Sequence, residues 1–319
     1  MRKSLFTTLD CHSETNRTIA ESYDSVHQHA QLADELGFNC LWVGEHHFFH
    51  GVGTIPNPAV LLGSLARSTR KIRLGPSVAV LPMRDATLIA EDYAMVDIIS
   101  GGRLNMGVAN GSQPLEYQRM GIDFERRGEA FKQGLEKLKA GWTSADVGAD
   151  SLNVRPIQAP MPPLFVATTT PEHAYLAGKA GFSVLMIVSH VDKDLATLQQ
   201  VIEAHTKGVS DSDTTCSDAE VVVTVFAYAA ESAEAALSTA AASAGRLLKV
   251  LSGRDVPDPV GLCRAMISRN TGLFGTTQQI AKQLDQYCKL SVEHISFFAN
   301  FGGMSSEQVA NSMRKLAAA

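Results

Sequence analysis

Short apolar segments alternate with longer amphipathic segments along almost the whole chain, and this alternation constrains the fold more than any other feature. In the first long segment, apolar side chains recur at steps of four, three, four and three residues from Ile19 to Ala33, which is one face of a helix. We predict strands at residues 4–9, 38–43, 72–81, 103–109, 164–167, 183–188, 221–229 and 294–299. Helices are predicted at residues 15–36, 57–69, 85–99, 126–142, 171–179, 192–207, 231–251 and 305–316, with another that begins at Thr276.

Strands and helices in this order predict a parallel sheet covered by helices. Eight strands favour an α/β fold of the (β/α)8 barrel type over a doubly wound sheet. No Gly-x-Gly-x-x-Gly follows the first strand, and this argues against a dinucleotide-binding fold.

The length of 319 residues, with 45% hydrophobic content, fits one barrel with insertions or two modest domains. The strand count favours a single barrel domain over residues 1–319. Residues 146–163 are polar, rich in Gly and Pro and without helical periodicity, so we predict an insertion there, as a loop or short hairpin. Residues 231–275 break the strand and helix rhythm, and we interpret them as a second insertion, a lid over a site.

Charge and cysteine usage limit the cellular setting and the partners. The formal net charge is -5 with no run of like charges, so neither nucleic acid nor an anionic membrane is an expected partner, and a small molecule is. No apolar window approaches the roughly 18 residues of a membrane span. The five cysteines are scattered without a Cys-x-x-Cys pair, which favours free thiols in a reducing compartment and a cytoplasmic protein.

The second predicted strand ends abruptly in Glu45, His46 and His47. Chemistry in α/β barrels gathers where strands end, so we interpret this triplet as a proton-transfer group. Neighbouring side chains of a strand point to opposite faces, so only one histidine should face a substrate. A zinc site would need a third ligand, for which His190 is the one candidate at the same face, and we favour a histidine base with no metal. A structural pair bonded to backbone remains the alternative.

Thr168, Thr169 and Thr170 follow the fifth predicted strand and lead into Pro171 at a predicted helix start. Hydroxyl groups and free N–H groups at a helix N-terminus suit a phosphate or another anion. The alternative is that these threonines merely cap the helix.

A broad set of motifs resembles the bacterial luciferase family of flavin-dependent monooxygenases and related coenzyme F420 oxidoreductases. The matching segments are Glu45-His46-His47-Phe48, Asn57-Pro58, Arg73-Leu74-Gly75, Val80-Leu81-Pro82, Ala90-Glu91-Asp92, Asp97, Ser100-Gly101-Gly102-Arg103, Gly107-Val108-Ala109-Asn110-Gly111, Glu116, Val166-Ala167, Phe274-Gly275-Thr276 and Ala299-Asn300. They span nearly the whole chain and look closest to luciferase α-subunit-like members.

The resemblance implies an insertion-bearing (β/α)8 barrel that binds reduced FMN at the carboxyl ends of its strands and activates O2 as a flavin C4a-peroxide. It makes His46 the catalytic histidine. It places the cofactor against the residues Ser77, Val78, Ala109, Asn110, Glu116, Thr168, Thr169, Thr170 and His190. Ser77-Val78 falls where the family often has a non-proline cis peptide bond.

The substrate pocket should be shaped by His47, Phe48, Phe49 and His190, together with the insertion at residues 231–275. The chain departs from luciferase at two further positions, where Ala109 replaces a reactive cysteine and Asn110 replaces an arginine that binds the FMN phosphate. The second departure removes a charge-assisted phosphate contact. A histidine at position 190 instead of tryptophan argues against light emission.

We therefore expect a two-component monooxygenase that oxygenates a small organic substrate with reduced FMN from a separate flavin reductase, since no nicotinamide-binding motif is present. The alternatives are an F420-dependent oxidoreductase on the same barrel and a weakly catalytic partner subunit, against which the Glu-His-His triplet counts. The family commonly pairs through the helices after the second and third strands. A homodimer through residues 57–69 and 85–99 is the expected assembly.

Overall fold

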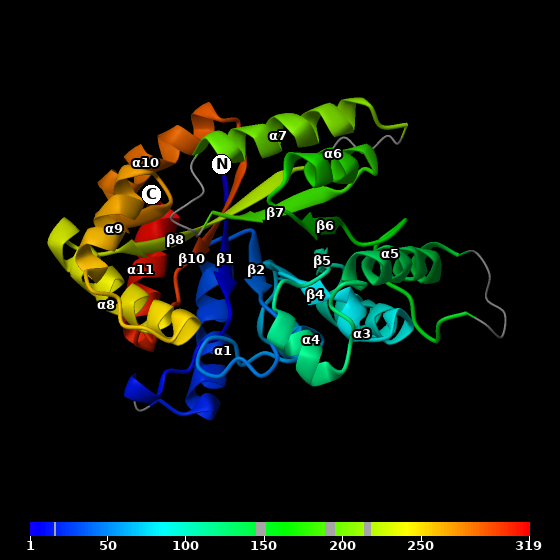
Figure 1. The fold of residues 1–319 in the computed structure, drawn as a ribbon, viewed down its shortest axis with the longest axis horizontal. Coiled ribbons are helices and arrows are strands. Elements are labelled where there is room, and N and C mark those ends of the chain that lie inside the picture. Colours follow the sequence, from blue (N-terminus) through cyan, green and yellow to red (C-terminus); the bar gives the residue numbers. More distant parts are fainter. Residues whose placement is uncertain (16, 145–150, 189–194, 214–217) are drawn as a thin grey trace.

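The computed structural model describes residues 1–15, 17–144, 151–188, 195–213 and 218–319. Its strands are β1 (Arg2–Thr7), β2 (Cys40–Val43), β3 (Arg73–Pro76), β4 (Ala79–Val80), β5 (Met106–Ala109), β6 (Leu164–Ala167), β7 (Ser183–Ile187), β8 (Val221–Ala229), β9 (Gly272–Gly275) and β10 (His294–Phe298). They lie at the centre of the molecule, and the helices surround them (Figure 1).

The helices are α1 (Ile19–Glu35), α2 (Pro58–Ser68), α3 (Ala86–Ser100), α4 (Pro114–Met120), α5 (Arg127–Thr143), α6 (Pro171–Lys179), α7 (Leu195–Ser210), α8 (Ala233–Ser252), α9 (Pro259–Ser268), α10 (Thr277–Lys289) and α11 (Ser306–Ala318). Two short 3-10 helices, η1 (Ser13–Thr15) and η2 (Leu81–Met83), follow β1 and β4. No helix among the described segments has the length and apolar character to cross a membrane.

All strand pairs between these elements are parallel, in the order β3-β2-β1-β10-β8-β7-β6-β5-β4, and β9 pairs with the end of β8. The two ends of this order, β3 and β4, follow each other in the chain, so the sheet forms a nearly closed barrel. The predicted (β/α)8 barrel is confirmed. Its carboxyl strand ends all open to one face.

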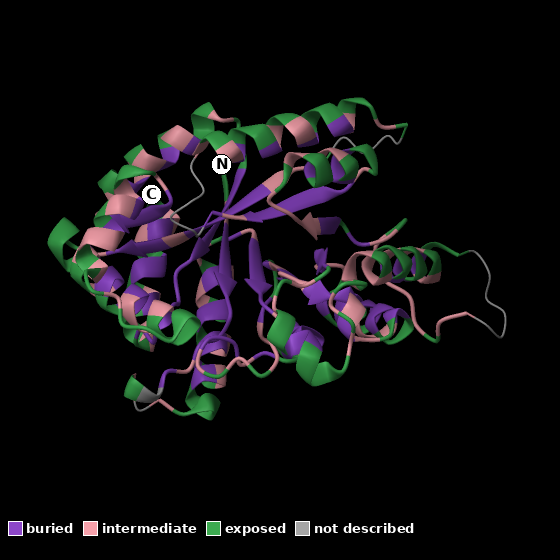
Figure 2. Cartoon of the chain, viewed as in Figure 1, coloured by how far each residue is buried: buried purple, intermediate pink, exposed green. Residues whose placement is uncertain are grey.

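The barrel interior is a packed core. Trp42 on β2 meets Phe165 on β6 edge to face with ring centroids 5.0 Å apart, a contact between strands on opposite sides of the barrel. Gly75 makes room for this indole, because a Cβ there would lie 2.6 Å from the Trp42 ring. Burial follows the same plan: the strands are buried and the outer helix faces are exposed (Figure 2).

Several sequence signals give the local structure that they predict. Asn57 caps α2 through its side chain, which accepts from the N–H of Ala59, and Pro58 takes the first helical position. Thr276 and Gln279 form the predicted capping box at the start of α10.

Three details differ from the sequence-based expectations. The strand predicted at 72–81 is two strands, β3 and β4, separated by a cis peptide bond between Ser77 and Val78. A short helix, α4, follows β5, and a short strand, β9, ends the segment 231–275. Both were missed because seven and four residues are too few for a clear hydrophobic period.

Candidate active site

The triplet after β2 stands at the carboxyl end of the barrel, where Gly44 turns the chain out of the strand. A Cβ on Gly44 would lie 3.2 Å from the Thr8 methyl group, so the turn packs tightly against the chain that follows β1. Gly53, in the loop after the triplet, leaves the space that the His46 side chain occupies, since a Cβ there would lie 2.6 Å from the His46 Cβ. Two glycines therefore set where His46 can stand.

His46 is held by a buried carboxylate on α4, the short helix that follows β5. Its Nδ1 lies 3.1 Å from Oε1 of Glu116 on α4, and the Glu116 side chain is 4% exposed while that of His46 is 25% exposed. An ionised carboxylate only accepts hydrogen bonds, so Nδ1 is the donor. Nε2 is then the ring nitrogen left for a substrate or a cofactor.

His47 has a different partner. Its Nε2 lies 3.1 Å from Glu45 Oε1, and the other oxygen of Glu45 accepts from the N–H of Val80 at 3.3 Å. His46 lines a cavity at this face and His47 does not. One histidine of the pair therefore faces a cavity, and His47 holds the loop.

The two phenylalanines after the triplet also lie apart. Phe49 lines the same cavity as His46 and stacks on its ring with centroids 5.3 Å apart. Phe48 is 43% exposed, and the Arg119 guanidinium lies 5.4 Å from its ring centre. The structure thus brings Phe49, and not Phe48, to the pocket.

The cavity next to His46 measures about 220 Å³, and we call it the aromatic cavity. It is lined by Phe6, Thr8, His46, Phe49, Val52, Gln113, Ile187, Phe226, Ala244, Leu247, Leu248, Leu251, Leu262, Met266, Phe274, Phe298 and Phe301. The residues from Ala244 to Phe274 come from α8, α9 and β9, the segment that we predicted to cover a site. The segment 231–275 therefore forms one wall of the cavity.

A second cavity of about 550 Å³ lies between α5 and α6, at the ends of β5 and β6, and we call it the α5–α6 cavity. Ala109, Asn110 and Thr168 line it. So do Lys132 of α5 and His173 in the first turn of α6. These hydroxyl, amide, ammonium and imidazole groups suit a phosphate, and the Glu129 carboxylate also lines the cavity.

The threonine turn does not act as a side-chain cap. Thr170 occupies the N-cap position of α6, yet its hydroxyl makes no capping bond. It lies 3.3 Å from the Thr168 hydroxyl, which also accepts from the Thr170 N–H. With Pro171 at the first helical position, the first turn of α6 keeps N–H groups without intrahelical partners. The alternative that these threonines only cap the helix is not supported.

Tyr117 ties α4 to the end of β5. Its hydroxyl donates to the carbonyl oxygen of Asn110 at 2.5 Å. Burial raises the pKa of Tyr117 to about 12, and the neighbouring Glu116 carboxylate adds to the shift. Tyr117 therefore keeps its proton at neutral pH and fixes both Asn110 and the helix that carries Glu116.

His190 lies outside the described residues, so its predicted place near the cofactor is not addressed by the structure. Among the described residues, no three His, Cys, Asp or Glu side chains gather in a way that could hold a metal ion.

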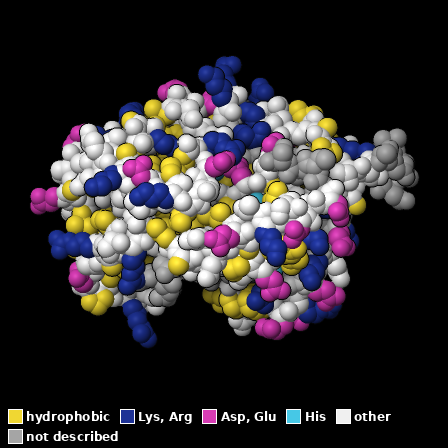
Figure 3. All heavy atoms as spheres, turned by 90° about the horizontal axis from the view of Figure 1, so that it is seen from above, with side chains coloured by type: hydrophobic (Ala, Val, Ile, Leu, Met, Phe, Trp, Pro, Cys, Tyr) yellow, Lys and Arg dark blue, Asp and Glu magenta, His cyan; other side chains and the backbone are white. Residues whose placement is uncertain are grey.

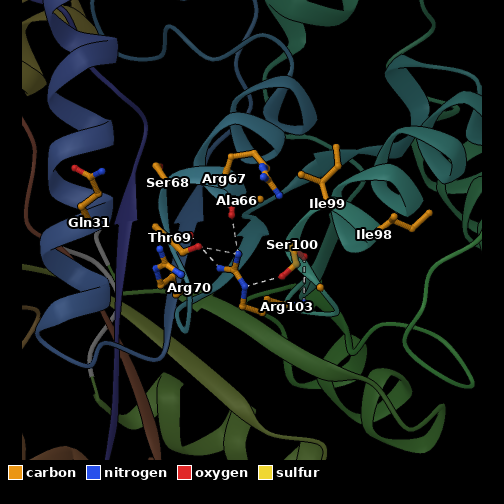
Figure 4. A pocket seen from close by; sticks show the side chains of 11 residues that line it. Gln31, Ala66, Arg67, Ser68, Thr69, Arg70, Ile98, Ile99, Ser100 and Arg103 are labelled. Carbon is orange, nitrogen blue, oxygen red and sulfur yellow. Dashed lines mark hydrogen bonds between the residues drawn. The ribbon is translucent and has the colours of Figure 1, made fainter.

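A surface hollow of about 760 Å³ lies at the opposite end of the barrel, where α2 and α3 end (Figure 4). Arg103 lines it, but its guanidinium is occupied by the carbonyl oxygens of Ala66 and Ile72 and by the Thr69 hydroxyl, at 2.7–3.0 Å. Its Nε donates to the Ser100 carbonyl. This arginine holds the ends of two helices together, so the hollow is structural.

Charge on the outer surface is mixed in sign. Lysine and arginine side chains alternate with aspartate and glutamate over the face seen in Figure 3, without a field of one sign.

Sequence reasoning missed Thr8, Lys132 and the aromatic side chains of β8 to β10. Thr8 follows β1 directly, so the rule that strand ends carry function could have found it. Lys132 lies on a polar helix face with no local signal, and only the packing of α5 beside α6 brings it to the cavity.

The chain matches the luciferase-like monooxygenase family model over residues 1–294. It belongs to this family. The oxygenase component of flavin-dependent trigonelline monooxygenase from Acinetobacter baylyi is 26% identical over 345 residues, covering 99% of this chain and 93% of that protein.

Solved structures share the fold. A monooxygenase from Streptomyces bottropensis superposes with a TM-score of 0.89 at 23% identity, over 99% of this chain and 98% of that one. The oxygenating constituent of 3,6-diketocamphane monooxygenase from Pseudomonas putida, in complex with FMN, gives 0.79 at 17% identity, over 99% and 97%. An F420-dependent secondary alcohol dehydrogenase gives 0.74 at 16% identity, over 100% and 99%. The prediction of a monooxygenase of this family is confirmed, and the fold alone is shared by enzymes of both cofactors.

Proposed function

We propose that this chain is the oxygenase component of a two-component monooxygenase, which binds reduced FMN and oxygenates a small organic substrate with O2. One observation carries the proposal: His46, fixed by the buried Glu116, lines an apolar cavity at the carboxyl face of the barrel. The relationship to the trigonelline enzyme supports the two-component arrangement.

The residues present fit FMN. Its phosphate would be held by Thr168, Thr170 and the start of α6, with Asn110 and Lys132 in the same cavity. Lys132 supplies the positive charge that asparagine at position 110 does not. Ser77, Val78, Ala109 and Thr169 are proposed to lie along the cofactor, and Glu116 to act through His46. When bound, reduced FMN would supply the electrons that activate O2.

The protein's own part is to position groups and exclude water. His46 presents Nε2 as a hydrogen-bond acceptor or base, because Nδ1 is engaged by Glu116. The apolar walls from β8, β10 and α8 keep water from the reacting groups. The flavin residues come from the side of the barrel with β4, β5 and β6, and the aromatic cavity comes from the side with β1, β8 and β10, so a substrate and the flavin could meet next to His46.

The partners and the setting are further parts of the proposal. A separate flavin reductase would deliver the reduced cofactor. Exposed apolar side chains on α2 and α3 support a homodimer. Cys11, Cys40, Cys263 and Cys288 are free thiols, which supports a cytoplasmic location. We also propose that residues 1–319 form a single domain.

The decisive experiment compares cofactors. Purified protein is titrated anaerobically with reduced FMN and, in parallel, with reduced F420, and each complex is then mixed with O2 in a stopped-flow spectrometer. We expect tight binding of reduced FMN and a transient spectrum that is neither reduced nor oxidised flavin. If the protein binds reduced F420 and not reduced FMN, and the complex does not react with O2, the F420-dependent oxidoreductase would replace this proposal.

A His46→Ala variant gives the matching test of the site. It should bind reduced FMN with unchanged affinity and lose oxygenation, because the α5–α6 cavity is intact while the proton-handling group is gone. Unchanged turnover by this variant would remove His46 from the mechanism.

A further inference from the structure

The wall of the aromatic cavity is built around a connected set of phenylalanine rings. Phe226 on β8 lies 4.8 Å from Phe298 and 4.9 Å from Phe301, and Phe6 lies 5.0 Å from Phe298. These rings hold one another in offset or edge-to-face contacts, so this part of the wall is formed before a ligand arrives.

Phe226 differs from the rings around it. Phe6, Phe298 and Phe301 are buried at 6% exposure or less, whereas Phe226 is half-buried and lines the cavity. It therefore offers an open ring surface to a ligand. Leucines of α8, among them Leu247 and Leu251, line the same cavity.

Among the residues that the structure describes, no aspartate, glutamate, lysine or arginine lines this cavity. The polar side chains in its lining are Thr8, His46 and Gln113. A charged ligand would lose its hydration here without gaining an opposite charge, which is unfavourable by several kcal/mol. The lining therefore discriminates against ions.

Thr8 carries an unsatisfied polar group at this wall. The residue is 5% exposed, and its Oγ1 has no hydrogen-bond partner. A buried hydroxyl without a partner is costly, so a ligand atom that bonds to it recovers that free energy. The Thr8 methyl group lies next to Gly44.

We propose that the aromatic cavity selects a small neutral aromatic substrate with one hydrogen-bonding group, and that Thr8 is a specificity-determining residue that binds this group. The substrate ring lies against Phe226 and its polar group faces Thr8. The cavity of about 220 Å³ favours a compact molecule over an extended chain. The inference deepens the proposed function and rests on it, because the ligand of this cavity is a substrate only if the chain is the proposed monooxygenase.

The test measures binding to the flavin-free protein, so it needs no turnover. Acetophenone is a neutral aromatic probe with one acceptor, ethylbenzene is close to it in shape without the acceptor, and benzoate carries a charge. Dissociation constants are measured by ligand-observed NMR. We expect acetophenone to bind about five- to tenfold more tightly than ethylbenzene, the factor for one neutral hydrogen bond, and benzoate to bind weakest.

The Thr8→Val variant keeps the side-chain shape and removes the hydroxyl. It should lose the preference for acetophenone over ethylbenzene while its melting temperature stays within a few degrees of the parent. Thr206→Val, on the exposed face of α7, is the matched control and should change nothing. Phe226→Leu should weaken both neutral probes together, because it removes ring contact and leaves Thr8 in place.

Two results would overturn the inference: benzoate binding as tightly as acetophenone, or an unchanged preference in Thr8→Val. Because no flavin is present, these results are separate from a failure of the proposed function. Selective binding of acetophenone, with no flavin-dependent oxygenation by the complete system, would support the cavity assignment and refute the monooxygenase chemistry.

Discussion

A single oxygen atom of Glu116 holds both His46 and the chain that carries it. Oε1 lies 3.1 Å from the His46 Nδ1 and accepts from the backbone N–H of His47 at 2.9 Å. The ring orientation and the loop position are thereby coupled through one buried carboxylate. Glu116 is a positioning residue, since it acts through His46.

Removal of this carboxylate should impair catalysis more than binding. Glu116→Ala leaves the His46 ring without an orienting partner and should lower kcat about 10- to 100-fold, as for other residues that orient a metal-ligating or catalytic histidine. Glu116→Gln keeps an acceptor oxygen and should retain more activity. The FMN dissociation constant and the KM should stay near those of the parent.

Glu125→Gln, an exposed acid in the next loop, is the control and should be fully active. The double variant His46→Ala/Glu116→Ala should be no slower than His46→Ala, because both changes disable the same group. Additive losses would mean that Glu116 acts independently of His46.

Lys132 is expected to provide the cationic contact for the cofactor phosphate. It lines the α5–α6 cavity together with Asn110 and Thr168. Lys132→Ala should weaken FMN binding about tenfold, as for the loss of one charge-assisted hydrogen bond, and riboflavin binding should be unaffected. Fluorescence titration measures both ligands. Lys137→Ala, on the same helix but outside the cavity lining, is the matched control; equal effects on FMN and riboflavin would exclude a phosphate contact.

The barrel could be predicted because the sequence signals that specify its strands and helices are local. Strand and helix periods, the Asn57 cap and the Thr276 capping box each act within a few residues, and their outcome does not depend on distant parts of the chain. The division of residues 72–81 into two strands occurs at the cis peptide bond between Ser77 and Val78, which the hydrophobic pattern does not encode.

The site could be predicted only in part, for a related physical reason. The triplet Glu45-His46-His47 was found because it stands at the end of a strand, and strand ends converge in any barrel. The family resemblance then singled out His46. The partnership with Glu116 and the entry of Lys132 depend on how α4 and α5 pack, which no local pattern encodes. Arg103 shows the converse. It belongs to a motif shared with the family, yet its hydrogen bonds hold helix ends together and do not contribute to the candidate active site.

Asp34 gives the fold a defined acid sensitivity. Burial alone would raise the pKa of its carboxyl, but backbone N–H groups of Arg70, Lys71 and Ile72, at 2.6–2.8 Å, outweigh burial and hold the pKa below its ordinary value. A carboxyl whose folded pKa is depressed contributes stability above its unfolded pKa and loses it as pH falls through the folded pKa.

We therefore expect Asp34→Asn to be destabilised by about 1–2 kcal/mol at pH 7, because one N–H loses its acceptor oxygen. The difference from the parent should shrink below about pH 4, where the parent carboxyl also takes up a proton. Urea denaturation at several pH values measures this difference in the free energy of unfolding. Asp24→Asn, exposed on the same helix, should match the parent throughout; a difference for Asp34→Asn that persists unchanged at low pH would contradict this account.

The outer faces of α2 and α3 should form the contact between two copies of the chain. Val60 is 72% exposed, Leu88 52% and Met95 50%, and Ile98 and Ile99 are also exposed. Apolar side chains gathered on two adjacent packed helices indicate a protein contact. In a twofold-symmetric dimer each substitution enters the interface twice, so its effect is doubled.

Met95→Glu should therefore convert the dimer to a monomer at micromolar concentration, because two uncompensated carboxylates would be buried at the interface at a cost of several kcal/mol each. Sedimentation equilibrium measures the mass. Ile19→Glu, which replaces an equally exposed apolar residue at the start of α1, is the control and should remain dimeric. A parent protein that sediments as a monomer, or a Met95→Glu variant that stays dimeric, would place the contact elsewhere. The melting temperature of the variant should fall only by the contribution of the lost interface. The fold of each protomer should be unaffected, since the side chain of Met95 points away from the core.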